Sequence, residues 1–533
     1  MASRTYDAIV IGAGHNGLET AAYLARAGLS TLVLERRHEE GGGANTEEAV
    51  LPGFRHNLHA NYMEFFDIIP MIPDFDLENC GLRSVTPENQ WGIAFADGRP
   101  PIVLHRNDLV EKDGESIARH SKADAYTWME LKKRTMGFGP FIAANIYNAP
   151  TPRSPEEGQM LEMMFGDLGV GAHFAAKTCK AVIDEIYEST EMRTLMYRVC
   201  VEFGVALETA GTGAGVLYSL PWMCGRCRVT LGGTHTLAKA MTQACYREGV
   251  EIIENAMVDK ISVEDGRAVG VVTRLGEFRA NKVVASNADV RQVLVDMVGP
   301  EHLSPLFYRR AKAFRYGPSH VLATPALCLH EPPTYTSARW DPDIDNCFYT
   351  VIGYETNEEV ARYCHDAETG RLPKPACGTW VNTLWDPSQA PPGKHSATGW
   401  FFFPEASRFS ASEWADIRAT YMEEFLELWG QYAPNMHHDN VLAMRLYTPE
   451  QMERKNLMWE GNFSLGALDP DQSGINRPFP EAVGGRLELE GLYLCGSSGY
   501  PGGGIHAAPG YNAYKTIAED LGLPSPVIEE RGY

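Results

Sequence analysis

The sequence lacks several features that would place it outside the ordinary globular enzymes. No hydrophobic run is long enough to cross a bilayer, and no basic segment with an apolar stretch precedes the strand-like pattern that begins at Tyr6. The eleven cysteines are odd in number and scattered along the chain, which argues against a dense disulfide framework and favours reduced thiols. We therefore expect a cytoplasmic protein without a membrane span or secretory signal.

Positive charge is also scarce. The 533 residues include 47 Lys and Arg against 69 Asp and Glu, a formal net charge of −22. A chain with this balance repels a phosphate backbone unless it has a local basic stripe, and we find none. Nucleic acid is therefore not an expected partner. The hydrophobic content of 44% is typical of a globular protein, and the length allows two cores or one elaborated enzyme domain.

The N-terminus has the pattern of a dinucleotide-binding unit. Residues 6–12 form an apolar strand that ends in glycine, and GAGHNG at 12–17 follows before a helix that stops at Gly28. The three glycines allow a tight turn, the approach of a pyrophosphate and close helix–strand packing, in that order. The next strand ends on Glu35, an acid that can accept hydrogen bonds from ribose hydroxyls. These features predict a bound dinucleotide.

Two later blocks return to the same pattern. In the first, from about 221 to 297, a glycine pair precedes a helix-like stretch and several short strands. In the second, from 455 to 533, a strand at 491–496 ends in glycine, and PGGGIHAAPGYNA at 501–513 leads into a helix. The intervening stretches are irregular, apart from a hairpin pattern around 96–98, a strand at 399–403 and a helix at about 412–433.

Four motifs together resemble the phytoene desaturase-like branch of the flavin amine oxidase superfamily. They are GAGHNGL at 12–18, ERRHEEGGG at 35–43, LGGTHTLAKAM at 231–241 and LYLCGSSGYPGGG at 492–504. The resemblance covers the nucleotide-binding blocks and implies FAD as the cofactor. It does not identify a substrate, because members of the family include carotenoid desaturases, isomerases and oxidoreductases of other kinds.

The resemblance and the block pattern together predict an α/β fold. We expect a discontinuous Rossmann-like FAD-binding domain with an inserted α+β substrate-binding domain. The FAD-binding domain would comprise residues 1–79, 221–297 and 455–533. The substrate-binding domain would comprise residues 80–220 and 298–454.

The resemblance also implies which residues contact FAD. The fingerprint glycines would meet the pyrophosphate, Glu35 the adenosine ribose, Val258 the adenine, and the C-terminal glycines the flavin. The expected contacts are Gly12, Gly14, His15, Asn16, Gly17, Glu35, Arg36, Gly42, Gly43, Ala44, Val258, Gly496, Gly503, Gly504 and Ile505. One departure from the family is that residues 462–465 read NFSL where relatives often have an aromatic–His pair, so no histidine role is transferred there.

A flavin accepts a hydride, so the protein has to aim a substrate C–H bond at it and manage the accompanying proton. Histidine and tyrosine side chains near the predicted flavin segments could donate to a substrate carbonyl or remove a proton. Each could equally be a hydrogen-bonded packing residue. The candidates are His506, Tyr500, Tyr511, His59, His56 and Tyr62.

The leading hypothesis is an FAD-dependent dehydrogenase or desaturase that forms C=C bonds in a small or medium apolar molecule, possibly a cyclic ketone. A flavin amine oxidase and a non-redox flavin-binding isomerase or interaction protein are the alternatives. Only one dinucleotide fingerprint is present, so electrons are expected to leave to oxygen, a quinone or a carrier protein rather than to NAD(P).

Three further patterns have plainer explanations. Cys224 and Cys227 have thioredoxin-like spacing but do not follow the strand-to-helix turn of that motif. No His or Cys set has convincing metal-ligand spacing, so no metal is expected. An apolar stripe at 160–168 could touch a membrane, but acidic residues interrupt it, which favours core or homodimer packing.

Overall fold

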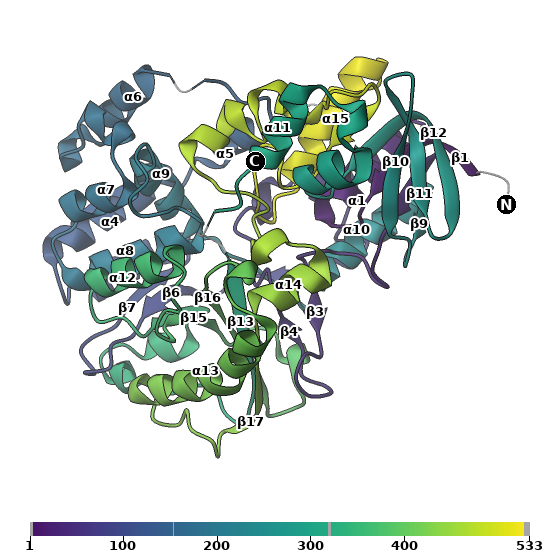
Figure 1. Cartoon of the computed structure of the whole chain (residues 1–533). Coiled ribbons are helices and arrows are strands. Elements are labelled where there is room, and N and C mark those ends of the chain that lie inside the picture. The colour runs from purple at the N-terminus through teal and green to yellow at the C-terminus, as the bar shows by residue number, and fades with distance from the viewer. Residues whose placement is uncertain (1–3, 153, 318–320, 527–533) are drawn as a thin grey trace.

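The computed structural model describes residues 4–152, 154–317 and 321–526. Figure 1 shows three neighbouring regions: a sheet with its helices, which includes β1 and β9–β12; a helical region with α4 and α6–α9; and a second sheet with α13. The chain passes repeatedly between them, so each is built from segments far apart in the sequence. This α/β architecture confirms the predicted fold class.

The first sheet has the strand order β10-β11-β12-β1-β2-β9, with β18 paired to β12. Strands β12, β1, β2, β9 and β18 are mutually parallel, whereas β10, β11 and β12 form an antiparallel meander. Parallel strands end at one edge, so their terminal loops meet there. The bounds are β1 (Arg4–Ile11), β2 (Thr31–Leu34), β9 (Glu251–Ile253), β10 (Val258–Glu264), β11 (Arg267–Thr273), β12 (Gly276–Ser286) and β18 (Leu492–Leu494).

Three helices pack together against this sheet: α1 (His15–Arg26), α10 (His235–Arg247) and α15 (Ala508–Leu521). The buried face of α1 includes Leu18, Ala21 and Ala22, and the small alanines let the neighbouring helices approach closely. Gly28, with φ of 90°, follows the helix in the left-handed conformation that glycine adopts without strain. The first strand, the glycine turn and the helix after it thus form at the positions that the sequence pattern predicts.

The second sheet has the order β17-β13-β16-β15-β14-β6-β7. Its strands are β6 (Asn89–Ile93), β7 (Ile102–His105), β13 (Leu322–Leu329), β14 (Tyr349–Ile352), β15 (Cys377–Trp380), β16 (His395–Phe402) and β17 (Val441–Tyr447). The 22-residue helix α13 (Ala411–Tyr432) buries Trp414, Phe425 and Trp429 in one cluster with Phe401 and Phe403. This aromatic core covers the face of the second sheet that points away from the pocket described below.

The helical region joins the second sheet through α8 and α12. Its helices are α3 (Val110–Ile117), α4 (Lys122–Thr135), α5 (Gly139–Ile146), α6 (Glu156–Phe165), α7 (Cys179–Ile186), α8 (Thr190–Glu202) and α9 (Gly213–Met223), with α12 (Asn357–Glu368) packed on α8. The smaller elements are α2 (Met71–Asp74), α11 (Pro305–Ala313), α14 (Pro449–Asn456), β3 (Thr46–Glu47), β4 (His56–Asn57), β5 (Ser84–Val85) and β8 (Val229–Thr230).

Two observations bear on where the regions divide. Residue 221 falls inside α9 rather than at a linker. The chain after 297 stays with the first sheet, because Phe307, Phe314 and Tyr316 pack in one buried cluster with Val284. The segment that contains these three residues therefore packs with the first sheet.

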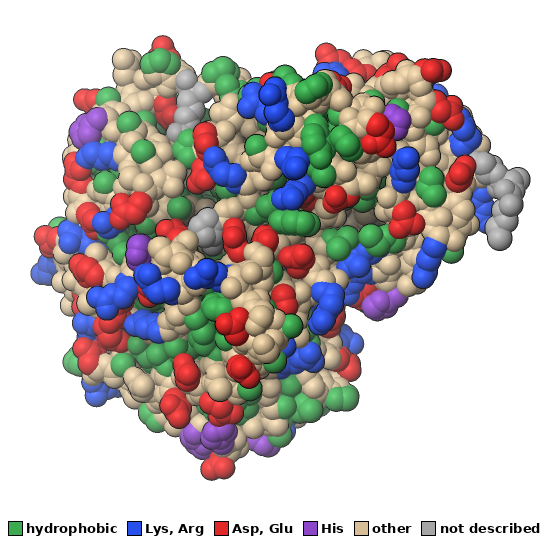
Figure 2. Space-filling view, viewed as in Figure 1, with side chains coloured by type: hydrophobic (Ala, Val, Ile, Leu, Met, Phe, Trp, Pro, Cys, Tyr) green, Lys and Arg blue, Asp and Glu red, His purple; other side chains and the backbone are tan. Residues whose placement is uncertain are grey.

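The surface shows charges of both signs. On the face in Figure 2, Lys and Arg side chains are interspersed with Asp and Glu, and apolar side chains gather in the middle of the view. Helix α6 buries Leu161 and Phe165 and leaves Met163 81% exposed. Within the described ranges, no helix combines the length and the apolar character needed to cross a membrane.

Candidate active site

A large pocket of about 430 Å³ lies where the three regions meet. On one side its lining comes from the β1–α1 turn, the end of β2, the start of β10 and the loop after β12. On the other side it comes from the end of α8, from α9 and from β16, which Figure 1 places away from the first sheet. The pocket thus extends from the nucleotide-binding sheet to the helical region.

The glycine turn leaves open space at the first end. Gly14 is the N-cap of α1, and no side chain caps the helix there, so the positive end of the helix dipole faces the pocket. A Cβ on Gly17 would lie 2.1 Å from the carbonyl oxygen of Gly12, and a Cβ on Gly14 would lie 2.6 Å from Nδ2 of Asn287. The backbone contact admits only glycine at position 17, whereas a Cβ at position 14 would displace the Asn287 side chain, and the exposed backbone suits a pyrophosphate.

Glu35 is held at the carboxyl end of β2 by backbone amides. The amide of Ala13 donates to its Oε2 at 2.8 Å, and the amide of Arg37 donates to its Oε1 at 2.8 Å. These bonds orient a buried carboxylate toward the pocket and leave it lone pairs for ribose hydroxyls. Next to it, the Arg36 guanidinium donates to the backbone carbonyl of Lys455.

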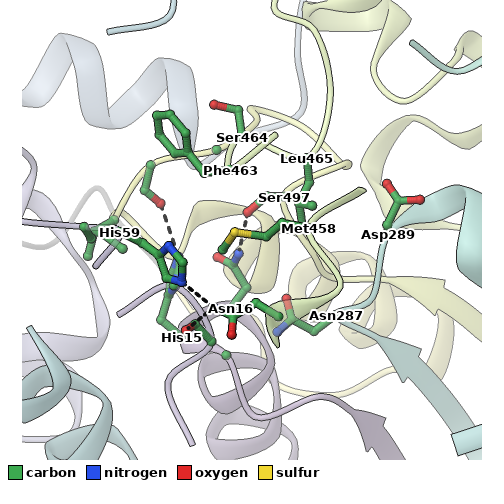
Figure 3. Close-up of a pocket in the computed structure, with 18 of the residues that line it drawn as sticks. His15, Asn16, His59, Asn287, Asp289, Met458, Phe463, Ser464, Leu465 and Ser497 are labelled. Atoms are coloured by element: carbon green, nitrogen blue, oxygen red, sulfur yellow. Dashed lines mark hydrogen bonds between the residues drawn. The ribbon is translucent and has the colours of Figure 1, made fainter. Parts of the chain in front are cut away.

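The C-terminal glycine segment faces α1 across the pocket. Nδ2 of Asn16 donates to Oγ of Ser497 at 3.2 Å, as Figure 3 shows, and a ring nitrogen of His15 lies 3.2 Å from the carbonyl oxygen of Gly504. Burial lowers the pKa of His15 to about 4, so the ring is neutral at pH 7. Oδ1 of Asn16 is buried without a hydrogen-bond partner in the described part of the chain. An incoming polar group could satisfy it.

Most of the predicted cofactor residues line this one pocket. Those in the lining are Gly12, Gly14, His15, Asn16, Glu35, Arg36, Gly42, Gly43, Val258, Gly503, Gly504 and Ile505. Gly17, Ala44 and Gly496 lie just behind it. At Gly17 and Gly496 another part of the backbone lies very close. A Cβ on Gly496 would lie 2.5 Å from the carbonyl oxygen of Asn287. Ala44 is fully buried.

Two of the six predicted catalytic residues also line the pocket: His59 and Tyr62. Nε2 of His59 lies 2.6 Å from Nδ2 of Asn456, and burial lowers the pKa of the ring to about 3. Tyr62 sits among Trp380, Trp400 and other rings, and burial raises the pKa of its hydroxyl well above the usual value. Both side chains are therefore neutral at pH 7.

The other four candidates lie outside the lining. His56 is buried with Nε2 3.1 Å from the carbonyl oxygen of Leu327, and His506 contacts the carbonyl of Gly503 and the amide of Ala508. The Tyr500 hydroxyl donates to the carbonyl of Asn145. Tyr511 packs against Tyr23 and Tyr147. Residues that are close in sequence to the predicted flavin-binding segment therefore do not all reach the pocket.

Sequence reasoning missed several lining residues. They include Glu64, Glu202, Asn287, Asp289, Met458, Phe463, Ser464 and Leu465. Figure 3 shows Phe463 and Ser464 on the opposite side of the pocket from His15 and Asn16. Asn287 had a detectable signal: it follows β12, which is parallel to β1, so it had to lie at the sheet edge where Gly12 begins the turn.

The cysteines and acidic residues of the described chain do not indicate a second redox or metal centre. Each cysteine of the chain is free, and Cys224 and Cys227 are buried. Burial raises the pKa of both thiols, which makes them poor nucleophiles at pH 7. No group of three or more His, Cys, Asp or Glu side chains is placed to hold a metal ion within the described residues.

Comparison with known proteins decides the family. Residues 10–68 match a family model described as an NAD(P)-binding Rossmann-like domain. The chain is 32% identical to a subunit of limonene dehydrogenase from Castellaniella defragrans, over 98% of both chains. The chain belongs to the phytoene desaturase-like branch of the flavin amine oxidase superfamily.

More distant members agree with that assignment. Prolycopene isomerase 1, chloroplastic, of an Oncidium hybrid cultivar is 22% identical over 98% of this chain and 86% of its own. The fold matches a triple mutant of putrescine oxidase with a TM-score of 0.61 at 12% identity, over 98% of this chain and 99% of that one. This superfamily member is an FAD-dependent oxidoreductase that acts on a small molecule.

The pocket of this flavoenzyme fits its cofactor. An uncapped helix N-terminus, the close backbone approach at Gly17, and the unpartnered Oδ1 of Asn16 are features that a pyrophosphate and a polar ring system would use. When bound, FAD supplies the hydride acceptor. The chain itself supplies the cradle and the chamber beyond it.

Proposed function

We propose that this flavoenzyme is a dehydrogenase that forms a C=C bond in a small or medium apolar molecule. The observation that carries the proposal is the character of the pocket beyond the glycine cradle. Its walls there are mainly aromatic and aliphatic: Phe65, Phe203, Val205, Val216, Leu220, Met223, Trp400 and Phe463. Apolar walls bind an apolar substrate at roughly 25 cal/mol for each Å² removed from water, and they also keep water from the reacting carbons.

The fingerprint, Glu35, Val258 and the 503–505 segment are proposed to hold FAD along the first half of the pocket. Their common presence in one lining supports this assignment. The proposed FAD-binding domain is 1–79, 221–297 and 455–533, supported by first-sheet strands at 4–34, 251–286 and 492–494. The packing of Tyr316 and its neighbours extends the proposed middle piece to about 317. The substrate-binding domain then comprises 80–220 and the remainder up to 454.

The relative from Castellaniella defragrans supports the class of substrate. Its name assigns limonene to that protein, and the two chains align over 98% of their lengths. Its name also makes it one subunit of an enzyme. For the present chain we propose oxygen, a quinone or a carrier protein as the electron acceptor, because only one dinucleotide fingerprint is present. We propose a cyclic, apolar substrate for the present chain, a hydrocarbon or a cyclic ketone.

Amine oxidation is a second candidate because of one feature of the pocket. Two carboxylates, Glu64 and Glu202, share the lining with Trp400 and Phe463, whose rings lie 5.1 Å apart. Aromatic faces beside carboxylates attract ammonium groups. The same feature has another role if the substrate is apolar, as argued below.

The two functions are separated by anaerobic reduction of the bound flavin. The purified holoprotein is mixed with limonene, a cyclic ketone, a primary amine and a polyene in turn, and the visible flavin absorption is followed. We expect bleaching by limonene or the ketone, with a product two hydrogens lighter by mass spectrometry. Bleaching by the amine alone would overturn the proposal. Reoxidation with air, a quinone or a carrier protein then identifies the electron acceptor.

A further inference from the structure

Two acidic side chains reach the apolar part of the pocket from different segments. Glu64 follows β4 in the stretch that also provides Tyr62, and Glu202 is the last residue of α8. An ionised carboxylate in apolar surroundings is costly unless it is paired, so two such groups beside a substrate chamber need an explanation.

Glu202 is anchored through one oxygen only. Its Oε2 lies 2.6 Å from Nη1 of Arg198 and accepts a hydrogen bond from the Tyr349 hydroxyl at 2.8 Å. Arg198 is itself fixed, since its Nη2 donates to the carbonyl of Trp400 at 3.0 Å and its guanidinium lies over the ring of Phe402. Oε1 of Glu202 is buried and has no hydrogen-bond partner among the described residues.

The electrostatic surroundings favour proton uptake at this pair. Burial raises the pKa of Glu202 to about 7, although the Arg198 charge opposes that rise. Burial also raises the pKa of Glu64 to about 7, and the neighbouring charge of Glu202 adds to the effect. The other titratable groups acting on the pair are Tyr62, Arg198, Cys227, Tyr349 and Cys377.

We propose that Oε1 of Glu202 accepts the proton that the substrate loses, with Glu64 as a second buried carboxyl group in the same pocket. This rests on the proposed dehydrogenase function. In that reaction one carbon gives up a hydride, with its electron pair, to the flavin. The adjacent C–H bond breaks, its electron pair becomes the new π bond, and its proton forms an O–H bond to Oε1.

Two other titratable side chains of the pocket, His59 and Tyr62, are less suited to this step. His59 has a ring nitrogen committed to Asn456, and its lowered pKa makes it a weak base. Tyr62 holds its proton because burial raises the pKa of its hydroxyl. Arg198 and Tyr349 act as positioning residues, because they hold Oε2 and thereby direct the other oxygen of Glu202.

Glu202→Gln tests the base directly. Gln keeps the size and the buried position but accepts no proton, so we expect the rate of flavin reduction by substrate to fall roughly 100-fold or more. Wild type is expected to reduce faster as pH rises through about 7, because the carboxylate form is the active one. The variant should lose this rise while keeping its flavin. An unchanged rate and pH profile in Glu202→Gln overturns the inference.

Glu64→Gln and a control variant separate the pair from a general effect of charge. Because the charge of Glu202 raises the pKa of Glu64, Glu64 stays protonated while Glu202 ionises. Replacing Glu64 by the neutral Gln should therefore leave the apparent pKa of the reduction rate near 7 and the maximal rate within about tenfold of wild type. Glu405→Gln is the control: Glu405 is half-buried with a pKa raised by burial, yet it does not line the pocket. Its rate profile should match wild type.

A second readout does not depend on turnover. Infrared spectra of the substrate-free holoprotein should contain a protonated-carboxyl band that titrates near pH 7. Part of this band should vanish in Glu202→Gln and persist in Glu405→Gln. If no apolar substrate bleaches wild type, the proposed function fails, and the infrared titration still tests the pair. If wild type bleaches and the band is identical in Glu202→Gln, only the pair is overturned.

Discussion

The two ends of the pocket are built from different kinds of group, mainly backbone at one end and side chains at the other. At the cofactor end the contacts are made largely by backbone, with Gly14 at the helix start and amides holding Glu35. At the proposed substrate end the walls include side chains from α8, α9 and β16, and the carboxyl groups of Glu64 and Glu202 lie among them, with Arg198 behind Glu202. One end depends on the shape of the main chain, and the other on buried charge within an apolar shell.

Because of this difference, the two ends should tolerate different amino-acid substitutions. A backbone cradle is insensitive to most side-chain changes but intolerant of an added methyl group where the chain passes close to itself. Removing the cation of a buried ion pair is costly because the carboxylate is then stranded in an apolar site, whereas a Gln in place of the carboxylate still accepts a hydrogen bond from the cation. Substitutions at the two ends should therefore affect flavin content and stability in different proportions, which gives three ways to test the comparison.

The largest effect is expected for Arg198→Met. The change strands the Glu202 carboxylate in an apolar site and should lower the free energy of unfolding by about 3–5 kcal/mol. Without Arg198 the pKa of Glu202 rises further. A raised carboxyl pKa in the folded state means that stability falls as pH rises from the ordinary value of 4.5, so the loss should be greater at about pH 8 than at about pH 5.

Urea unfolding at the two pH values measures this. Arg371→Met is the control, because Arg371 pairs with Asp366 on the surface and is 56% exposed, so its loss should cost far less. Folded Arg198→Met should still bind flavin. If its flavin content falls and its stability does not, the two ends are not separate in the way described.

Gly17→Ala should have the next largest effect. The new Cβ would lie 2.1 Å from the Gly12 carbonyl oxygen, so α1 must move away from β1 at a cost of about 1–3 kcal/mol. Flavin content, read from the visible spectrum of the purified protein, should fall sharply. Gly137→Ala is a matched control, since nothing lies within 4 Å of the added Cβ. Full flavin occupancy in Gly17→Ala would contradict the steric argument.

The smallest effect is expected for Glu35→Gln. The amide keeps one acceptor oxygen but loses the charge that strengthens the bonds from Ala13 and Arg37. The dissociation constant for FAD should rise about tenfold, which is about 1.4 kcal/mol, with little change in the rate of flavin reduction once the site is saturated. Fluorescence titration of the flavin-free protein measures the constant. If Glu35→Gln loses as much FAD binding as Gly17→Ala, then a side chain, not the backbone, contributes most of the FAD binding at this end.

Much of the cofactor end could be predicted from sequence because its signals are local. The strand–turn–helix at 4–26, Glu35 at a strand end and the 492–494 strand each follow from neighbouring residues. The placement of Val258 needed the family resemblance. Asn287 was within reach of topology alone, since β12 and β1 run parallel and end at the same edge.

The substrate end could not be predicted because its residues meet only in the tertiary structure. Glu202 ends a helix, where an acid normally faces water. Arg198 is its i,i+4 neighbour on the same helix, but Tyr349, which also holds Glu202, comes from a strand far away in the sequence. Tyr500 and Tyr511 flank the flavin-binding segment in sequence, yet one points to Asn145 and the other packs into a tyrosine cluster. Side-chain direction depends on packing that no local pattern encodes.

The pairing of β18 with β12 has a consequence for how the enzyme matures. The nucleotide fingerprint is complete by Glu35, but the sheet that supports it gains its last strand only when Leu492–Leu494 has been made. At roughly 5–20 residues per second, a ribosome needs on the order of half a minute or more to cover that interval. We therefore expect FAD to load late in synthesis, so that stalled ribosomes carry bound flavin only after this strand has emerged.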